Sequence, residues 1–291
     1  MSETQMHGDA VPAFEMQIVP DLPFPAHDGA SLSGTLYRPD SPKPCPVLVA
    51  IHGGGWKRGS PDRYRNWGVW LAQRGIALFA IKYRLADRAQ HRFPIPALDV
   101  FAALRFVSAS AAELKVAPER IGLMGDSAGA HLACLAALAG DPSALASGAP
   151  AADRTLFNIR AVVAVYGVYD LLQQWEHDQI ARPTDHVTEA LMGFSPLEDK
   201  LAYYRASPLA YTTVRAPRSS FLICWGTGDD VVDWEPQSGR LVRELKQTGQ
   251  YVRTVAVQGA PHFWIDESIE ANGSFTGFLA PKLFKFLQEQ L

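Results

Sequence analysis

Residues 121–133 read IGLMGDSAGAHLA and place one serine, Ser127, between two glycines. An apolar run precedes GDSAG, and an apolar helical pattern follows it directly. Such a junction indicates a sharp strand-to-helix turn, because glycine removes the Cβ atoms that would crowd the serine. Ser127 is therefore either a nucleophile exposed by the turn or a small residue that a tight turn requires.

Short apolar runs on both sides of this stretch alternate with longer amphipathic segments. Most of the later runs are continuous, as expected for strands buried on both faces of a parallel sheet. Parallel strands need helical crossovers, so this order predicts an α/β fold with about eight mostly parallel strands and helices on both faces. The predicted strands are 14–20, 31–39, 46–53, 77–84, 120–126, 161–167, 221–227 and 252–259, and the predicted helices are 62–74, 94–113, 127–139, 234–248 and 275–290.

The segment 170–215 departs from this alternation. It is long, polar in places and carries several aromatic side chains. Because loops at strand ends commonly carry function, we interpret it as a helical, lid-like insertion over one end of the sheet. A solvated connector is the alternative. We expect one domain over residues 1–291 that includes this insertion.

Composition excludes several classes of protein. A chain of 291 residues with 47% hydrophobic residues can bury a large core, and its net charge of −3 gives no electrostatic reason to bind nucleic acid. Three scattered cysteines are too few for a disulfide framework or a metal site. The first 17 residues lack the features of a secretory signal, and no stretch approaches the roughly 20 apolar residues of a membrane span. We therefore expect a soluble, cytoplasmic protein.

A serine nucleophile needs a base, and the base needs an orienting acid. Of the eight histidines, His262 stands apart because it follows the last predicted strand, in a loop that can reach over Ser127. The acid should follow the strand before it, where Asp229, Asp230 and Asp233 compete. The motif order is then Ser, Asp, His.

A glycine-rich stretch, AIHGGGWKRG at 50–59, follows the third predicted strand. Three successive glycines let backbone N–H groups approach a ligand, as the oxyanion of acyl transfer requires. We expect the N–H groups of Gly53, Gly54 and Ala128 in this role, and we expect His52 to stabilise the loop. The stretch lacks the lysine spacing of a phosphate-binding loop.

Together these motifs resemble the esterase branch of the α/β-hydrolase fold, which includes hormone-sensitive-lipase-like carboxylesterases and feruloyl or acetylxylan-type esterases. The resemblance covers about residue 30 to the end of the chain. Its G-x-x-D-x-x-V turn matches Asp229 among the competing aspartates. The motifs that carry it are HGGGW at 52–56, YRLA at 83–86, GDSAGAHLA at 125–133, YGVYD at 166–170, ASPL at 206–209, GTGDDVV at 226–232 and PHFW at 261–264.

The resemblance implies hydrolysis of carboxylic esters through an acyl-enzyme on a triad of Ser127, Asp229 and His262, without a cofactor or metal. The same HGGGW wording also resembles kynurenine formamidase-like hydrolases, so hydrolysis of an N-formyl amide is the alternative. A non-catalytic binding protein of this fold is a third interpretation. It is disfavoured because such proteins typically lose the nucleophile or the base, and this chain keeps both.

Aromatic residues near these motifs predict the substrate. Aromatic walls suit apolar or aromatic acyl and alcohol groups, although the same residues can also fill a core. We expect a small to medium ester as the ligand. Exposed sheet edges and a surface insertion are compatible with a homodimer. The predicted pocket walls are Trp56, Tyr166, Trp175, Phe263 and Trp264.

Overall fold

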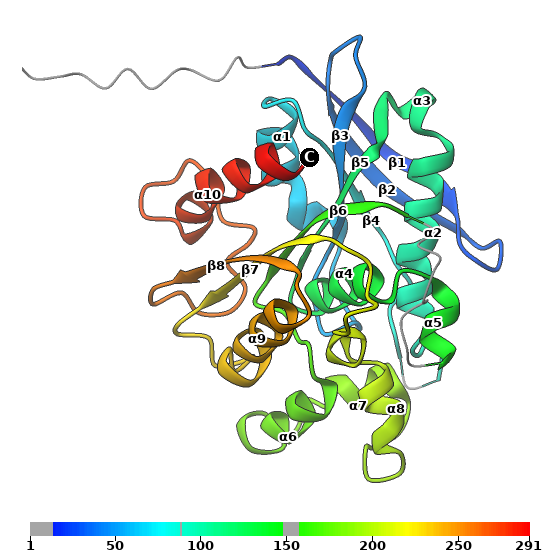
Figure 1. Ribbon diagram of the computed structural model, residues 1–291, viewed down its shortest axis with the longest axis vertical. Coiled ribbons are helices and arrows are strands. Elements are labelled where there is room, and N and C mark those ends of the chain that lie inside the picture. The colour runs from blue at the N-terminus through cyan, green and yellow to red at the C-terminus, as the bar shows by residue number, and fades with distance from the viewer. Residues whose placement is uncertain (1–13, 88, 148–156) are drawn as a thin grey trace, which may run out of the picture.

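The fold is built on one sheet, seen in a computed structural model that describes residues 14–87, 89–147 and 157–291 (Figure 1). Within these residues the sheet has eight strands in the order β1-β2-β4-β3-β5-β6-β7-β8. The β1–β2 and β2–β4 pairs are antiparallel, and all other neighbours are parallel. The bounds are β1 (Met16–Pro25), β2 (Ser31–Pro39), β3 (Cys45–Ile51), β4 (Ala77–Ile81), β5 (Val116–Asp126), β6 (Ile159–Val165), β7 (Ser220–Gly226) and β8 (Tyr251–Val257).

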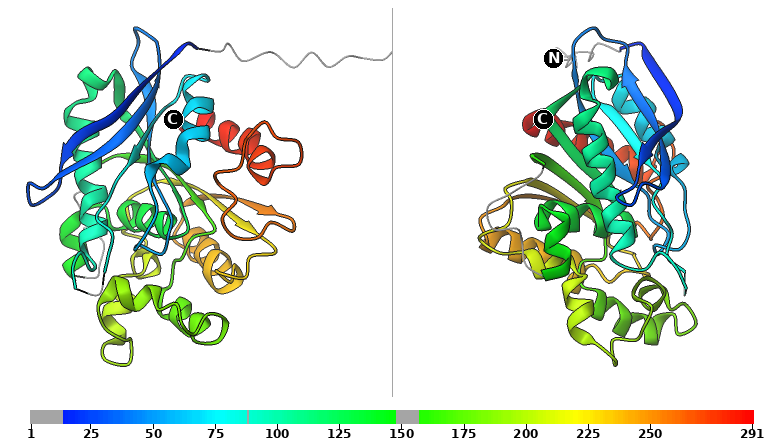
Figure 2. Two further views of the ribbon diagram at one scale, coloured as in Figure 1. Left: turned by 180° about the vertical axis from the view of Figure 1, so that it is seen from behind. Right: turned by 90° about the vertical axis from the view of Figure 1, so that its right-hand side faces the viewer.

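Helices cover both faces of the sheet, which confirms the predicted α/β class (Figure 2). The apolar residues of α1 and α10 pack on one face, and those of α2, α4 and α9 pack on the other. The bounds are η1 (Pro61–Tyr64), α1 (Arg65–Ala72), α2 (Ile95–Ala109), α3 (Ala111–Leu114), α4 (Ala128–Ala139), α5 (Pro142–Ser147), the π-helical turn η3 (Glu235–Gly239), α9 (Arg240–Gln247) and α10 (Phe275–Gln290).

Strand β3 shows why the predicted strands are continuous apolar runs. Val47, Val49 and Ile51 belong to the core on one face of the sheet. Leu48 and Ala50 belong to the core on the other face. Because successive side chains of a strand point to opposite faces, a strand covered on both sides needs an apolar residue at every position.

The two glycines around Ser127 let strand β5 turn directly into helix α4. A Cβ on Gly129 would lie 1.9 Å from the carbonyl oxygen of Ile51, and a Cβ on Gly125 would lie 2.3 Å from the carbonyl oxygen of Gly129. Any larger residue at either position would collide with backbone. The turn therefore places Ser127 at the carboxyl end of a central strand, where open α/β sheets bind ligands.

The segment 170–215 is built from short helices and lies beside α4 and α9 (Figure 1). Asp170 starts the first of them by accepting hydrogen bonds from the N–H groups of Leu172 and Gln173. The N–H of Leu171 donates to Ser207 Oγ at 2.9 Å, which joins the two ends of the segment. Its helices are α6 (Leu171–Ala181), α7 (Val187–Met192), α8 (Lys200–Arg205) and η2 (Pro208–Tyr211).

Among the helices of residues 14–87, 89–147 and 157–291, none has the length and apolar character that crossing a membrane requires. The cysteines are buried and free: Cys45, Cys134 and Cys224. Movement of 170–215 as a lid and formation of a homodimer stay predictions.

Candidate active site

Ser127 lies at the turn between β5 and α4 in a backbone conformation that few L-residues adopt. Its φ of 51° and ψ of −118° fall outside the regions favoured by non-glycine residues. Its N–H donates to the carbonyl oxygen of Val165 at 2.9 Å, which ties the turn to the neighbouring strand β6. Helix α4 begins at Ala128, so the N–H of Ala128 has no intrahelical acceptor and lies beside the hydroxyl.

His262 joins Ser127 and Asp229 in one row of hydrogen bonds. His262 Nε2 lies 3.0 Å from Ser127 Oγ, and His262 Nδ1 lies 2.7 Å from Asp229 Oδ2. An ionised carboxylate only accepts, so Nδ1 carries the proton and Nε2 is left to accept from the hydroxyl. The other oxygen of Asp229 accepts from the N–H groups of Val231 and Val232 at 3.0 and 2.9 Å. The carboxylate is therefore held with one oxygen aimed at the imidazole.

The other two aspartates of the same turn make different contacts. Asp233 Oδ1 accepts from the N–H of Glu235 at 3.2 Å, as the cap of a helical start. At Asp230 the backbone carbonyl oxygen lies 3.4 Å from His177 Nε2. Among the three candidates, Asp229 is the one in contact with His262.

The first glycine of the loop after β3 is not available to a ligand, contrary to the prediction for Gly53. Its N–H donates to Asp126 Oδ1 at 2.8 Å. The Asp126 carboxylate is fully buried and also accepts from the Tyr64 hydroxyl at 3.0 Å. Burial raises the pKa of this carboxyl, while Arg63, with Nη1 3.7 Å from Oδ2, acts in the opposite direction. The direction of the Gly53 N–H is therefore fixed by a carboxylate 73 residues further along the chain.

The next two glycines of the loop have backbone conformations that favour glycine. Gly54 has a φ of 120° and Gly55 a φ of 58°, and a Cβ on Gly54 would lie 2.1 Å from the carbonyl oxygen of Arg58. Gly55 lines the same pocket as Ser127 and Ala128. Gly55 and Ala128 thus lie on the Ser127 pocket, and Gly55 is an addition to the residues predicted; the donor role of Gly54 and Ala128 stays a prediction.

Two buried histidines support the loop from behind. His52 Nδ1 lies 2.8 Å from the Gly53 carbonyl oxygen, and its ring stacks on Tyr83 with centroids 4.4 Å apart. His131 Nδ1 accepts from Trp56 Nε1 at 3.1 Å, so its Nε2–H donates to the Ala206 carbonyl oxygen at 2.8 Å. This chain of hydrogen bonds links the glycine loop to the segment 170–215.

These histidines predict a loss of stability in mild acid. Burial lowers the pKa of His52 and of His131 to about 4. Both stay neutral in the folded protein, while the unfolded chain binds protons below about pH 6.5. Their contribution is complete above pH 6.5 and is lost as the pH falls from 6.5 to 4, by about 3 kcal/mol for each group. Urea unfolding at pH 8.5, 7.5 and 5.0 checks this. The two histidines should contribute equally at pH 8.5 and 7.5, and the free energy of unfolding should be lower at pH 5.0. A free energy of unfolding at pH 5.0 equal to that at pH 7.5 would contradict the prediction.

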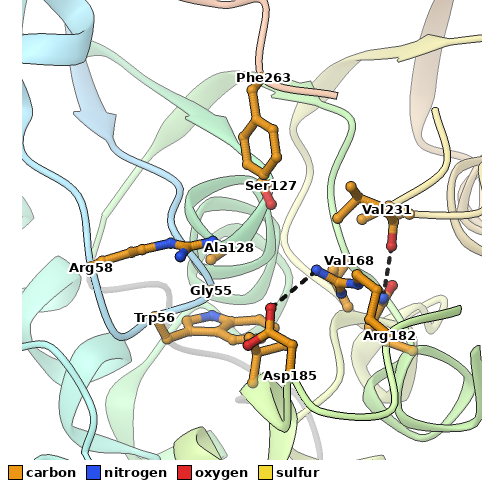
Figure 3. Close-up of a pocket in the computed structure, with 13 residues that line it drawn as sticks. Gly55, Trp56, Arg58, Ser127, Ala128, Val168, Arg182, Asp185, Val231 and Phe263 are labelled. Carbon is orange, nitrogen blue, oxygen red and sulfur yellow. Dashed lines mark hydrogen bonds and ion pairs between the residues drawn. The ribbon is translucent and has the colours of Figure 1, made fainter. Parts of the chain in front are cut away.

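A narrow pocket lies beside Ser127, with a cavity volume of about 20 Å³ that continues into open solvent (Figure 3). Two of the predicted aromatic walls, Trp56 and Phe263, line it. Four charged or amide side chains also line it, from the loop after β3 and from the segment 170–215. The lining residues are Gly55, Trp56, Arg58, Ser127, Ala128, Val168, Gln174, Arg182, Asp185, Val187, Val231, Val232 and Phe263.

The other three predicted walls lie elsewhere. Tyr166 and Trp264 are 1% exposed and pack on each other behind His262, with ring centroids 5.3 Å apart. The Tyr166 ring supports the imidazole at 4.5 Å, and its hydroxyl oxygen accepts from the N–H of Ile265. Trp175 Nε1 donates to Glu189 within the segment 170–215. The position of each aromatic residue close to a motif in the sequence did not predict whether its ring lines the pocket or packs elsewhere.

Backbone strain is concentrated at this site. Among non-glycine residues with positive φ, Trp56 (59°), Ser127 (51°), Tyr166 (39°) and Phe263 (66°) all lie in or next to it. Aromatic residues rarely adopt this region, and each such residue typically costs about 1–3 kcal/mol. The surrounding packing therefore holds the site in a conformation that the local chain disfavours.

Strain at Ser127 can be measured with two variants that both lack the hydroxyl. Ser127→Gly should be more stable than Ser127→Ala by about 1 kcal/mol, because glycine accepts the positive φ and this exceeds its larger loss of backbone entropy. Urea unfolding of the two variants gives the difference directly. Equal or reversed stabilities would show that the turn stores no strain at this residue.

Comparisons with known proteins identify the family of this chain. The profile of the BD-FAE family matches residues 35–245. Esterase LipC of Mycobacterium tuberculosis is 32% identical over 243 residues, which are 81% of this chain and 57% of LipC. Ethyl acetate hydrolase of Pseudomonas putida is 34% identical over 162 residues, 54% of this chain and 47% of that protein. This chain thus spans about half the length of these curated relatives.

A solved structure shows the same fold. Carboxyl esterase 2 of Tuber melanosporum superposes with a TM-score of 0.71 at 21% identity, over 99% of this chain and 90% of that one. Identity at this level is evidence for the fold alone. The family match covers most of the chain and includes the glycine loop, the Ser127 turn and Asp229. The chain therefore belongs to the BD-FAE family and adopts the α/β-hydrolase fold that its motifs predicted.

Proposed function

We propose that this protein hydrolyses carboxylic esters through an acyl-enzyme formed on Ser127. The observation that carries the proposal is the hydrogen-bonded row from Asp229 through His262 to Ser127, whose hydroxyl opens into a pocket. Two of the curated relatives are named as an esterase and an ethyl acetate hydrolase, which supports an ester as the bond that is cleaved.

In the first half of the reaction Ser127 Oγ attacks the ester carbonyl carbon, and His262 Nε2 takes the hydroxyl proton. Asp229 keeps the proton on Nδ1 and stabilises the imidazolium. The N–H groups of Gly54, Gly55 and Ala128 stabilise the oxyanion, and one such donor typically lowers the barrier by about 2.7–4 kcal/mol. The tetrahedral intermediate collapses, and His262 gives its proton to the departing alcohol.

In the second half water replaces the alcohol. His262 takes a proton from water, the hydroxide attacks the acyl carbon, and the proton returns to Ser127 Oγ as the carboxylic acid leaves. The serine, histidine and carboxylate are restored, so the cycle balances with one water consumed. These steps need only side chains and backbone of this chain.

The pocket supports a small to medium ester. Trp56 and Phe263 supply aromatic walls, and four valines add aliphatic ones. Hydrolysis of an N-formyl amide would use the same catalytic groups, but no feature of the pocket favours it. Ester hydrolysis is therefore the function proposed, with the amide as a comparison in its test.

The test combines covalent labelling with a substrate comparison. A fluorophosphonate probe should label the protein, and peptide mass spectrometry should locate the adduct on Ser127. The p-nitrophenyl esters from acetate to octanoate should be hydrolysed faster than formanilide. Absence of labelling would contradict a serine hydrolase, and a preference for formanilide would assign the amide reaction in its place.

A further inference from the structure

The charges beside Ser127 are unusual for a site expected to hold an apolar ester. Asp185 Oδ1 lies 2.6 Å from Lys57 Nζ, and Asp185 Oδ2 lies 3.4 Å from Arg182 Nη1. Arg182 Nη2 lies 2.6 Å from Asp178 Oδ1. Lys57, Arg182 and both carboxylates are therefore paired with one another, and Arg58 forms no ion pair with them. Figure 3 shows the Arg182–Asp185 pair and Arg58 across the pocket from it.

Arg58 is an exposed side chain that lines the pocket and forms no ion pair with the described residues, although its charge acts on the nearby Asp185 carboxylate. Within residues 14–87, 89–147 and 157–291, no carboxylate lies within ion-pair distance of its guanidinium. Its N–H donates to the Gly54 carbonyl oxygen at 3.1 Å, so its backbone is fixed to the loop that supplies the oxyanion donors. Figure 3 shows the side chain reaching from this loop toward the middle of the pocket. With three cations against two carboxylates, the cluster carries one uncompensated positive charge.

Arg182 adds an unused donor on the other side of the pocket. Its Nε is buried and has no hydrogen-bond partner among the described residues. A buried donor on a charged group is costly when it is unpaired, so an acceptor atom of a ligand would be favourable here. Asp185 offers little repulsion to an anion, because both of its oxygens are taken up by Lys57 and Arg182.

The remaining walls are apolar. Val168, Val187, Val231 and Val232 lie with Phe263 around the space between the two arginines. Apolar walls lower the local dielectric and strengthen the attraction between an anion and a nearby cation. The pocket thus combines aliphatic surface with a free positive charge close to the nucleophile.

We propose that the protein selects esters bearing a carboxylate, held by Arg58, a short aliphatic spacer away from the scissile carbonyl. The monoester of a short dicarboxylic acid is such a compound. A planar guanidinium matches a carboxylate with two parallel hydrogen bonds, which makes arginine well suited to this recognition. The proposal deepens the ester hydrolysis proposed above and rests on it.

The test compares each charged ester with its neutral analogue. Mono-p-nitrophenyl succinate, glutarate and adipate are paired with the corresponding primary amides, in which the free carboxylate is replaced by a carboxamide of similar size. The readout is the ratio of kcat/KM for acid over amide. We expect a ratio of about 10 for at least one spacer length, because a hydrogen bond to a charged group typically contributes about that factor. The ratio should fall when salt is raised from 0.05 to 0.5 M.

Variants assign the preference to one residue. Arg58→Ala should lower the ratio about 10-fold, and Arg58→Lys should keep part of it because the charge remains. Arg105→Ala is the matched control: it removes an exposed arginine on α2, outside the pocket, and should leave the ratio unchanged. A ratio that Arg58→Ala does not change, or a wild-type ratio of one or less at every spacer length, overturns the proposal.

The same experiment distinguishes failure of the selectivity proposal from failure of the proposed ester hydrolysis. If the neutral amides are hydrolysed without any preference for the acids, the selectivity proposal fails and ester hydrolysis stands. If none of the esters is hydrolysed and the fluorophosphonate probe labels nothing, the proposed function fails and the selectivity falls with it.

Discussion

Replacing Ser127 by alanine is expected to lower kcat for a p-nitrophenyl ester by about 10⁴- to 10⁶-fold. The variant keeps the pocket and the backbone donors but has no oxygen to form the acyl-enzyme. Residual hydrolysis should come only from oxyanion stabilisation and substrate positioning. Steady-state rates and a search for the acyl-enzyme by mass spectrometry measure the effect.

Ser268→Ala is the control for this experiment. Ser268 is an exposed serine in the loop that follows His262, and its loss should leave the rate within twofold. A Ser127→Ala variant that retained a tenth or more of wild-type turnover would exclude the acyl-enzyme route through this residue.

The second large effect is expected for Asp229→Asn, with kcat lowered by about 10⁴-fold near neutral pH. An amide in place of the carboxylate can donate to His262 Nδ1, which turns the imidazole into the wrong tautomer to accept a proton from Ser127. The backbone N–H groups of Val231 and Val232 would still have an oxygen to bind, so the turn should fold. Steady-state kcat over a pH series checks the prediction.

The neighbouring aspartates are close controls, because they lie on the same turn and compete for the role in sequence. Asp230→Asn and Asp233→Asn should keep kcat within about threefold, since neither side chain reaches His262. A large loss with one of these variants, together with a small loss for Asp229→Asn, would move the acid to that residue.

Much of the fold could be predicted because both faces of the sheet are covered. Continuous apolar runs such as 46–53 and 77–84 locate strands without knowledge of their partners. The ends of helices could be predicted less well from the sequence. The predicted helix 94–113 is divided into α2 and α3 at Ser110, and the short α5 was not predicted. A break of one residue and a helix of six residues leave almost no periodicity to detect.

A similar physical reason separates the site residues that could be predicted from the sequence from those that could not. Ser127, Asp229 and His262 follow strand ends, and parallel topology brings such ends together, so sequence alone could suggest them. The partner of the Gly53 N–H and the walls of the pocket depend on where side chains point after long-range packing. Arg58 and Arg182 carry no local signal, because charged residues in loops are usually solvated. Only the position of Arg58 shortly after the glycine run could have indicated a role.

The position of each catalytic candidate in the sheet has a consequence for how the protein loses activity. Ser127 follows β5, which has neighbours on both sides, whereas His262 follows β8, which is an edge strand. Amide hydrogens of β5 should exchange with solvent only through global unfolding, and those of residues 258–264 through smaller local openings. On mild heating, activity should therefore disappear while β5 remains protected in hydrogen exchange. Ser127 would still be held in position when the loop that carries His262 had already begun to open.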